Sequence, residues 1–190
     1  MTERGEHERA GAGRGGAAQP SAHDLSPVLV PDPLDLRVSV AAVVHWADSL
    51  QVRRRFMREV GFPLDDVPAF LVVNQLTYRG AMRPSDLAAA IGTGRANLTK
   101  IAQRLEGAGL VVRAADGRDA RSTLLALSPA GRAIGEQVVV VSAQHVQEKL
   151  VDWSAEEVDV LRRVMARFAR PALAELARSE QARTGPPPRG

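Results

Sequence analysis

Polar side chains that can hydrogen-bond to the edges of DNA bases are concentrated in one short segment. It contains Arg95, Asn97, Thr99, Lys100 and Arg104. Arginine and lysine can pair with the acceptors of guanine, asparagine suits adenine, and the threonine methyl group can contact thymine. On a helix laid in a major groove, the early members of such a set would reach the base edges. A solvated helix face would have a similar composition, so these residues alone do not decide the chemistry.

A second charged cluster follows closely along the chain. Asp116-Gly117 is a strong signal for a β-hairpin turn, and Arg118, Asp119 and Arg121 come directly after it. A hairpin beside a groove-lying helix can place arginine in the minor groove, where a narrow groove concentrates negative potential. We therefore predict that Arg118, Asp119 and Arg121 form a DNA-contacting wing.

The charge balance agrees with a polyanionic partner. Residues 79–121 carry eight cationic and four anionic side chains, which is more net positive charge than the +3 of the whole chain. Arg83 and Ser85 are the expected contacts to the DNA backbone. Arginine supplies nearly all of the cations, and it suits phosphate and guanine. High-GC coding also favours arginine over lysine, so composition alone does not prove a nucleic-acid partner.

Apolar spacing and turn signals predict the elements that position these residues. Leu36, Val40, Val43, Ala47, Leu50 and Met57 follow a helical period that ends at Gly61 and Pro63. The expected helices cover 35–61, 65–78, 84–91, 95–108, 129–151 and the stretch after 154, with strands over 110–114 and 122–127.

Local signals mark several of the expected helix ends. Asp65 or Asp66 can cap the second helix, and Gly92-Thr93-Gly94 separates the two short helices. Ser128-Pro129 opens the long helix, and Ser154 with Glu157 forms a capping box at the start of the last one. The valines of that long helix are poor helix formers, and Pro171 is expected to kink or end the last helix.

The expected fold class is mainly α with a small β-hairpin wing, a winged helix-turn-helix with N- and C-terminal dimerisation helices. We expect a domain over residues 34–181, with the winged helix-turn-helix at about 64–131 and the dimerisation helices at about 35–61 and 129–181. Residues 1–33 and 182–190 lack apolar periodicity or are rich in glycine and proline, so flexible tails are expected there.

Several other classes of site are disfavoured. The chain has no cysteine, which excludes disulfides, zinc–thiolate sites and thiol redox sensing. No nucleophile elbow, phosphate-binding loop or dinucleotide fingerprint is present, and the four histidines are scattered. We expect no enzyme activity, no cofactor and no metal. No apolar stretch has the length of a membrane span and no signal peptide is evident, so we expect a cytoplasmic protein without a membrane partner.

Taken together, these motifs resemble the MarR-type (multiple antibiotic resistance) family of winged helix-turn-helix transcription regulators. The resemblance rests on Arg83-Pro84-Ser85-Asp86-Leu87-Ala88, Leu98-Thr99-Lys100-Ile101-Ala102-Gln103-Arg104-Leu105-Glu106, Gly109-Leu110-Val111, Asp119-Ala120-Arg121 and Leu127-Ser128-Pro129-Ala130-Gly131. The order of expected helices matches the family from about Leu34 to Ala177.

The resemblance implies a homodimer joined by the first and last helices, with recognition by the helix that begins at Arg95. It also implies that Asp119 orients Arg121 in the wing. Two residues depart from the family pattern. Gly94 replaces a common capping serine, and Lys100 replaces a common arginine, which leaves the recognised DNA sequence open.

The resemblance further implies a small-molecule cleft beside the dimer helices. His45, Trp46 and Arg53 are the candidate residues, because an indole and a cation can hold an aromatic acid. The alternative is that Trp46 is ordinary core and that the arginine is merely solvated.

The resulting hypothesis is a sequence-specific, homodimeric DNA-binding regulator, a repressor that binds double-stranded DNA at a palindromic operator and is released by a small effector molecule. The alternative hypothesis is a winged-helix protein-interaction module without ligand regulation. Salt-dependent binding to DNA would discriminate between the two.

Overall fold

The computed structural model describes residue 32, residues 34–116 and residues 119–184. Seven helices and two strands follow one another in this part of the chain. They are α1 (Leu36–Asp48), α2 (Leu50–Glu59), α3 (Val67–Arg79), α4 (Pro84–Ala90), α5 (Arg95–Gly107), β1 (Val111–Asp116), β2 (Asp119–Leu127), α6 (Pro129–Lys149) and α7 (Ala155–Thr184). The expected fold class, mainly helical with one hairpin, is confirmed. The expected tails fall largely outside the described residues, although α7 extends to Thr184.

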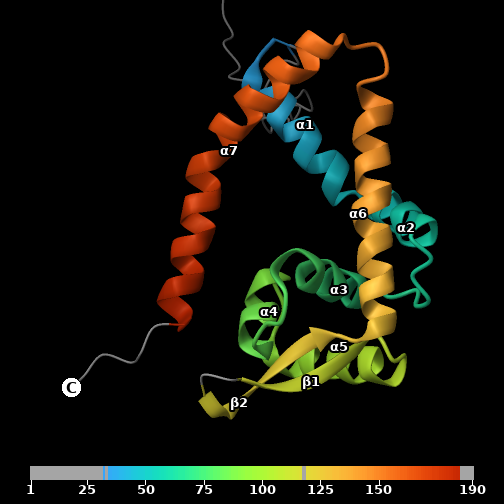
Figure 1. Ribbon diagram of the computed structural model, residues 1–190, viewed down its shortest axis with the longest axis vertical. Helices are drawn as coiled ribbons and strands as arrows, with labels where there is room; N and C mark the ends of the chain where they lie inside the picture. Colours follow the sequence, from blue (N-terminus) through green and yellow to red (C-terminus); the bar gives the residue numbers. More distant parts are fainter. Residues whose placement is uncertain (1–31, 33, 117–118, 185–190) are drawn as a thin grey trace, which may run out of the picture. The chain divides into compact units, whose positions relative to one another are not determined.

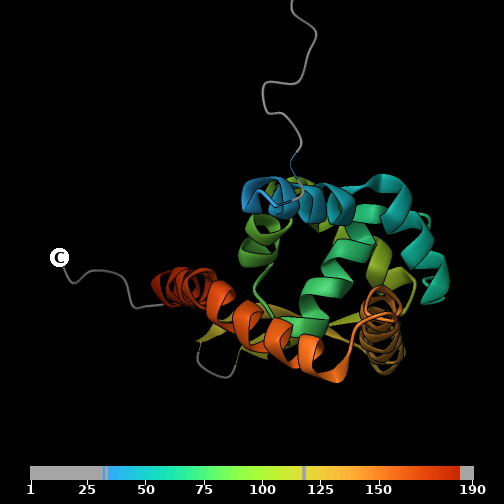
Figure 2. The same cartoon turned by 90° about the horizontal axis from the view of Figure 1, so that it is seen from above.

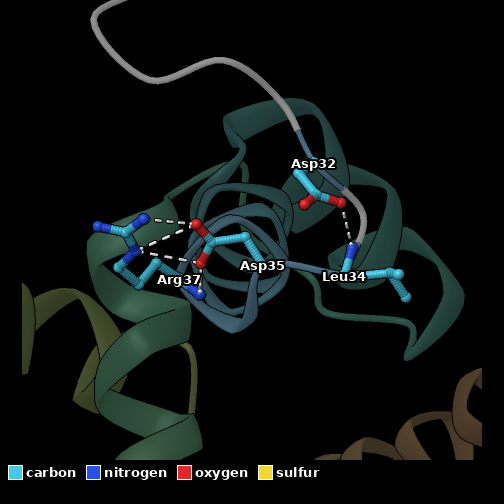
Figure 3. A network of polar contacts seen from close by, with 4 residues as sticks. All are labelled: Asp32, Leu34, Asp35 and Arg37. Carbon is cyan, nitrogen blue, oxygen red and sulfur yellow. Dashed lines mark hydrogen bonds and ion pairs between the residues drawn. The ribbon is translucent and has the colours of Figure 1, made fainter.

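The chain divides into two units, residues 1–42 and residues 43–190. The first unit contains the start of α1, shown in Figure 3. The Leu34 N–H donates to Oδ1 of Asp32 at 2.9 Å, and the Arg37 N–H donates to Oδ1 of Asp35 at 2.8 Å. The guanidinium of Arg37 also donates to Oδ2 of Asp35 at 2.6 Å, and this contact, more than any other, lowers the pKa of the Asp35 carboxyl. The Arg37 N–H is one of the backbone donors that the first helical turn leaves open, and Asp35 satisfies it.

The single helix expected over residues 35–61 is wrong, because the structure breaks it at Ser49. Ser49 has extended backbone angles (φ −59°, ψ 124°) between α1 and α2. Arg53 in α2 forms an ion pair with Asp48, the last residue of α1. Serine and aspartate favour helix ends because their side chains compete for backbone hydrogen bonds. The apolar period runs on through Ala47 and Leu50, so periodicity gave no sign of the break.

A compact core is built from α3, α4, α5, the hairpin and the start of α6. Figures 1 and 2 show these elements lying together on one side of the start of α6. Asp66 caps α3 by accepting the Ala69 N–H at 3.0 Å, as one of the two expected alternatives proposed. The largest fully buried side chains all belong to this core: Leu76, Leu87, Leu98, Ile101, Leu105, Leu125, Val72, Val73 and Val138.

The hairpin is joined to the chain segment that leads into α4. Strands β1 and β2 pair antiparallel with Val111 opposite Leu127, and the register is irregular at Ala115 and Asp116. Met82 and Leu125 form a separate antiparallel bridge with two hydrogen bonds, Met82 N–H to Leu125 O at 3.0 Å and the reverse at 2.8 Å. The base of the hairpin is therefore bonded to the entry of α4.

Helix α6 begins close against the preceding strands. The Ser128 hydroxyl accepts the Gly131 N–H at 3.0 Å and donates to the Gly109 carbonyl at 2.5 Å. A Cβ atom built on Gly131 would lie 1.9 Å from the Leu110 carbonyl oxygen, and one on Gly135 would lie 2.7 Å from Oγ1 of Thr77. Only glycine allows this approach, so α6 is held against the core by two positions one turn apart.

Helix α7 differs from the core elements in its packing. The capping box is confirmed, because the Ser154 N–H donates to Glu157 at 2.8 Å and the Glu157 N–H donates to the Ser154 hydroxyl at 3.3 Å. Pro171 does not end α7, which runs on to Thr184, and Figure 1 shows a bend along its length. None of its described side chains is buried. No helix in the described ranges is both long and apolar enough to cross a membrane.

Candidate nucleic-acid interface

Helix α5 presents two chemically different faces. Leu98, Ile101 and Leu105 are at most 1% exposed and anchor one face in the core. On the other face, four of the predicted base-reading residues are exposed: Arg95, Asn97, Thr99 and Lys100. Gly92 in the turn before the helix has a φ of +67°, a conformation that favours glycine, and this turn reverses the chain between α4 and α5.

The exposed face is available for an outside ligand. Within the part of the chain that the structure describes, the side chains of Arg95 and Lys100 form no hydrogen bond or ion pair. The Asn97 amide donates to the Thr93 hydroxyl at 2.8 Å, and the Thr99 hydroxyl donates to the Arg95 carbonyl at 3.1 Å. Both cations at the start of α5 are therefore unneutralised, as a surface that binds an anion requires.

Arg104 has a different environment from the other predicted recognition residues. Its Nε and one terminal nitrogen lie 2.7 Å and 2.6 Å from Oδ2 of Asp66, at the start of α3. The guanidinium remains 49% exposed. Sequence reasoning placed Arg104 in the recognition set from its helix position alone and did not associate it with Asp66, which is 38 residues away.

Arg83 is also engaged within the chain. Its guanidinium donates to Oδ2 of Asp116 at 2.8 Å and 3.2 Å, across 33 residues. Asp116 is almost completely buried, so this pair joins the turn end of β1 to the start of α4. Ser85, the other predicted backbone contact, is exposed and donates to Asp86 at 3.3 Å.

The predicted wing contacts are described only in part. Asp119 and Arg121 lie in β2, but their side chains are outside what the structure describes, and so is Arg118. Elsewhere on the hairpin, Arg113 pairs with Glu106 of α5 at 2.7 Å. Counting charges along residues 79–121 therefore overstates the free cations, because Arg83, Arg104 and Arg113 each have an acidic partner. The partner of Arg104 is Asp66, which lies outside residues 79–121 and was therefore not counted among the acids of that segment.

The candidate ligand residues lie near the end of α1 and in α2. Trp46 is 41% exposed, and the Lys149 ammonium lies 4.4 Å from its ring centroid. Arg53 is paired with Asp48, and His45 is exposed. A cation does sit on the indole, but it comes from α6 and was not among the expected residues. His145, one turn before Lys149, donates from Nε2 to Glu59 at 2.7 Å and packs on Phe56.

Comparison with protein families gives a match for the segment that runs from α3 into the hairpin. Residues 67–123 match the family model described as the MarR family. This segment of the chain is similar to the MarR family. The resemblance drawn from the sequence motifs is thereby confirmed. None of the curated proteins compared with the chain matches it.

Solved structures extend the likeness beyond the matched segment. A MarR family protein from Bacillus stearothermophilus is 20% identical, with a TM-score of 0.59 over 72% of this chain and 94% of its own. Transcriptional regulator Tm0710 from Thermotoga maritima is 18% identical, with a TM-score of 0.55 over 73% and 95%. Wild-type MarR from E. coli, in its apo form, is 26% identical, with a TM-score of 0.50 over 68% and 95%. The first two share the fold with this chain. Together, the comparisons show a winged-helix fold and a segment that is similar to the MarR family.

Proposed function

We propose that this MarR-type chain is a homodimeric repressor that binds a palindromic site on double-stranded DNA. Helix α5 enters the major groove, the wing residues Arg118, Asp119 and Arg121 contact the minor groove, and a small effector releases the complex. The observation that carries the proposal is the division of α5 into a buried apolar face and an exposed face with two unpaired cations. That division lets one helix be fixed by the core and still present side chains to a ligand.

The exposed residues have the chemistry for reading bases. Arg95, Asn97, Thr99 and Lys100 occupy the first turn and a half of α5, the part of a recognition helix that reaches base edges. Arg95 and Lys100 suit guanine, and Asn97 suits adenine. The Thr99 hydroxyl is bonded to its own helix, so the methyl group is the part left to contact thymine.

Exposed apolar residues support the homodimer. Val160, Val164, Met165, Phe168 and Leu173 of α7 are between 44% and 62% exposed. Near the junction of α6 and α7, an apolar hollow of about 410 Å³ is lined by residues that include Val146, Leu150, Leu161 and Met165. Exposed apolar surface on this scale is typical of an interface. A second copy that covers it gives two recognition helices and a palindromic site with half-sites about 10 base pairs apart.

The effector that releases the complex is expected to bind near the end of α1. Trp46 offers a partly exposed indole with the Lys149 ammonium over its ring. His45 precedes it in α1, and Arg53 lies in α2. A small aromatic acid is the class of compound that an indole and neighbouring cations would hold. Such a ligand can weaken DNA binding only by favouring a conformation that binds DNA poorly.

The test is to measure binding to DNA from upstream of the chain's own gene and to a scrambled duplex, at two salt concentrations. Arg95→Ala is expected to weaken operator binding by about 1–3 kcal/mol and to relax the preference at one position of each half-site. Arg163→Ala is the control, because Arg163 is an exposed arginine of α7 that forms no ion pair in the described chain. Equal binding to both duplexes by the wild type would contradict the proposal and favour a protein-interaction module.

A further inference from the structure

We propose that Asp66 is a positioning residue for DNA discrimination, and that it acts by holding Arg104 of the recognition helix. This inference rests on the proposed DNA reading by α5. Both guanidinium contacts converge on Oδ2 of Asp66, at 2.7 Å and 2.6 Å, while Oδ1 accepts the Ala69 N–H at 3.0 Å. One carboxylate therefore caps α3 and anchors α5 at the same time.

The N-cap hydrogen bond fixes the position of the Asp66 carboxylate, unlike that of an acidic side chain that is free on the surface. Its side chain is only 18% exposed, and Ala69 and Phe70, in the helical turn that it caps, are buried in the core. Most exposed ion pairs contribute little because two long side chains must be ordered. Here the acid is already ordered by the N-cap bond, so only the arginine loses freedom when the pair forms.

Because Arg104 lies far along α5 from Arg95, a small change at the Arg104–Asp66 pair would produce a large displacement at the start of the helix. Arg104 lies nine residues after Arg95, which is about 13 Å along a helix that rises 1.5 Å per residue. A tilt of about 10° at the anchored end would move the reading end by roughly 2 Å. Recognition side chains must be held within about 0.5 Å and 10–20° of their productive geometry. Fixing the far end of α5 therefore controls where the reading side chains meet the bases.

If Asp66 anchors α5, neutralising it should change the affinity for operator DNA in the opposite direction from the one that its charge alone predicts. Neutralising an acid close to DNA should strengthen binding to every sequence, because the protein gains a positive charge. If Asp66 instead orients α5, the same neutralisation weakens binding to the operator selectively. The direction of the change therefore distinguishes the two roles.

Asp66→Asn is the informative variant, because asparagine is as good an N-cap as aspartate but cannot pair ionically with Arg104. We expect about a tenfold loss of operator affinity, with scrambled-duplex affinity unchanged or slightly higher. Arg104→Gln should cause a similar selective loss, and the double variant should lose no more than either single one, because both remove the same interaction. Arg104→Lys keeps the charge but not the two-point contact, so it should also lose discrimination.

Asp65→Asn is the matched control. Asp65 is exposed, its only ion pair within the described residues is with Arg54 at 3.9 Å, and it undergoes the same change of charge one residue away. Thermal unfolding without DNA confirms that each variant is folded at the assay temperature. The inference is overturned if Asp66→Asn behaves like Asp65→Asn, or if Arg104→Gln weakens all sequences alike and lowers the salt slope by about one phosphate contact. A wild type without sequence preference contradicts the proposed function itself, whereas the variants test only the anchor.

Discussion

The proposed recognition helix α5 and the last helix α7 use apolar residues in opposite ways. In α5, Leu98, Ile101 and Leu105 are at most 1% exposed, and the polar residues face outward. In α7, Val164, Met165 and Phe168 are at least 50% exposed. Helix α5 is completed by its own chain, since α3, α4 and the hairpin cover its apolar face. The described chain supplies no such cover for α7.

The difference in exposure between α5 and α7 implies two sources of stability, burial within one chain and burial against a second copy. Burial within the chain stabilises the winged helix at any protein concentration. Burial of α7 against a second copy would stabilise it by mass action, and so only where enough protein is present. Substitutions in the two regions should accordingly fail in different ways.

The largest effect is expected at the centre of the winged-helix core. Leu105→Ala should lower the free energy of unfolding by about 2–5 kcal/mol, because Leu105 is fully buried and its removal leaves a cavity. Urea unfolding at a dilute protein concentration measures this. Leu173→Ala deletes the same groups from a residue that is 62% exposed and should change the result by less than about 0.5 kcal/mol. Equal losses of unfolding free energy in Leu105→Ala and Leu173→Ala would contradict the proposed difference in packing between α5 and α7.

A smaller loss is expected where α6 touches the core. Gly131→Ala should destabilise the chain by about 1–3 kcal/mol, because the new methyl group would overlap the Leu110 carbonyl and force α6 outward. Gly107→Ala, at the end of α5, meets nothing within 4 Å and should instead stabilise the helix by about 0.5–1 kcal/mol. Thermal unfolding of the two variants gives the comparison. If Gly131→Ala leaves the unfolding temperature unchanged, the close approach of α6 to the Leu110 carbonyl is not required for stability.

In α7 the expected effect is on assembly rather than on folding. Phe168→Asp places a charge within the exposed apolar stripe and should shift the protein from dimer to monomer in sedimentation at micromolar concentration. The circular dichroism of the winged helix should be retained. Ala166→Asp adds the same charge on the opposite side of the helix, two residues away, and should remain dimeric. A wild type that sediments as a monomer would refute the proposed covering of α7 by a second copy.

The smallest effect concerns the capping box at the start of α7. The Ser154 N–H and then its hydroxyl lower the pKa of Glu157 from its ordinary value. Because the folded pKa is the lower one, the stabilisation is complete above the ordinary value and is lost as the pH falls through the folded value. Titration of the Glu157 side-chain resonance by NMR should show the lowered pKa. In Ser154→Ala the shift of the Glu157 pKa should shrink but persist, since the backbone N–H still donates. A shift that disappears in this variant would contradict the backbone N–H as the larger cause.

Features set by neighbouring residues could be predicted from the sequence. The cap by Ser128, the capping box of Ser154 and Glu157, and the boundaries of α5 are each specified by contacts within four residues. The MarR resemblance gave the order of elements in the same way, through short motifs.

Features that join distant residues could not be predicted. Nothing local pairs Arg104 with Asp66 or Arg83 with Asp116, because the folded core brings these residues together across 38 and 33 positions. The break at Ser49 was hidden for another reason, since the apolar period is the same on both sides of it. Sequence patterns therefore located the exposed face of α5 but not the acids that neutralise its neighbours.

The two-faced construction of α5 has a consequence for how such a chain can diverge. Arg95, Asn97, Thr99 and Lys100 are exposed and contribute nothing to the core, whereas the residues between and after them hold the helix in place. Surface substitutions of this kind usually change stability by no more than about 0.5 kcal/mol. Gene duplicates can therefore change these four side chains without passing through an unfolded intermediate. A combinatorial library randomised at the four positions would consist largely of folded proteins, in which the proposed DNA preference could be selected directly.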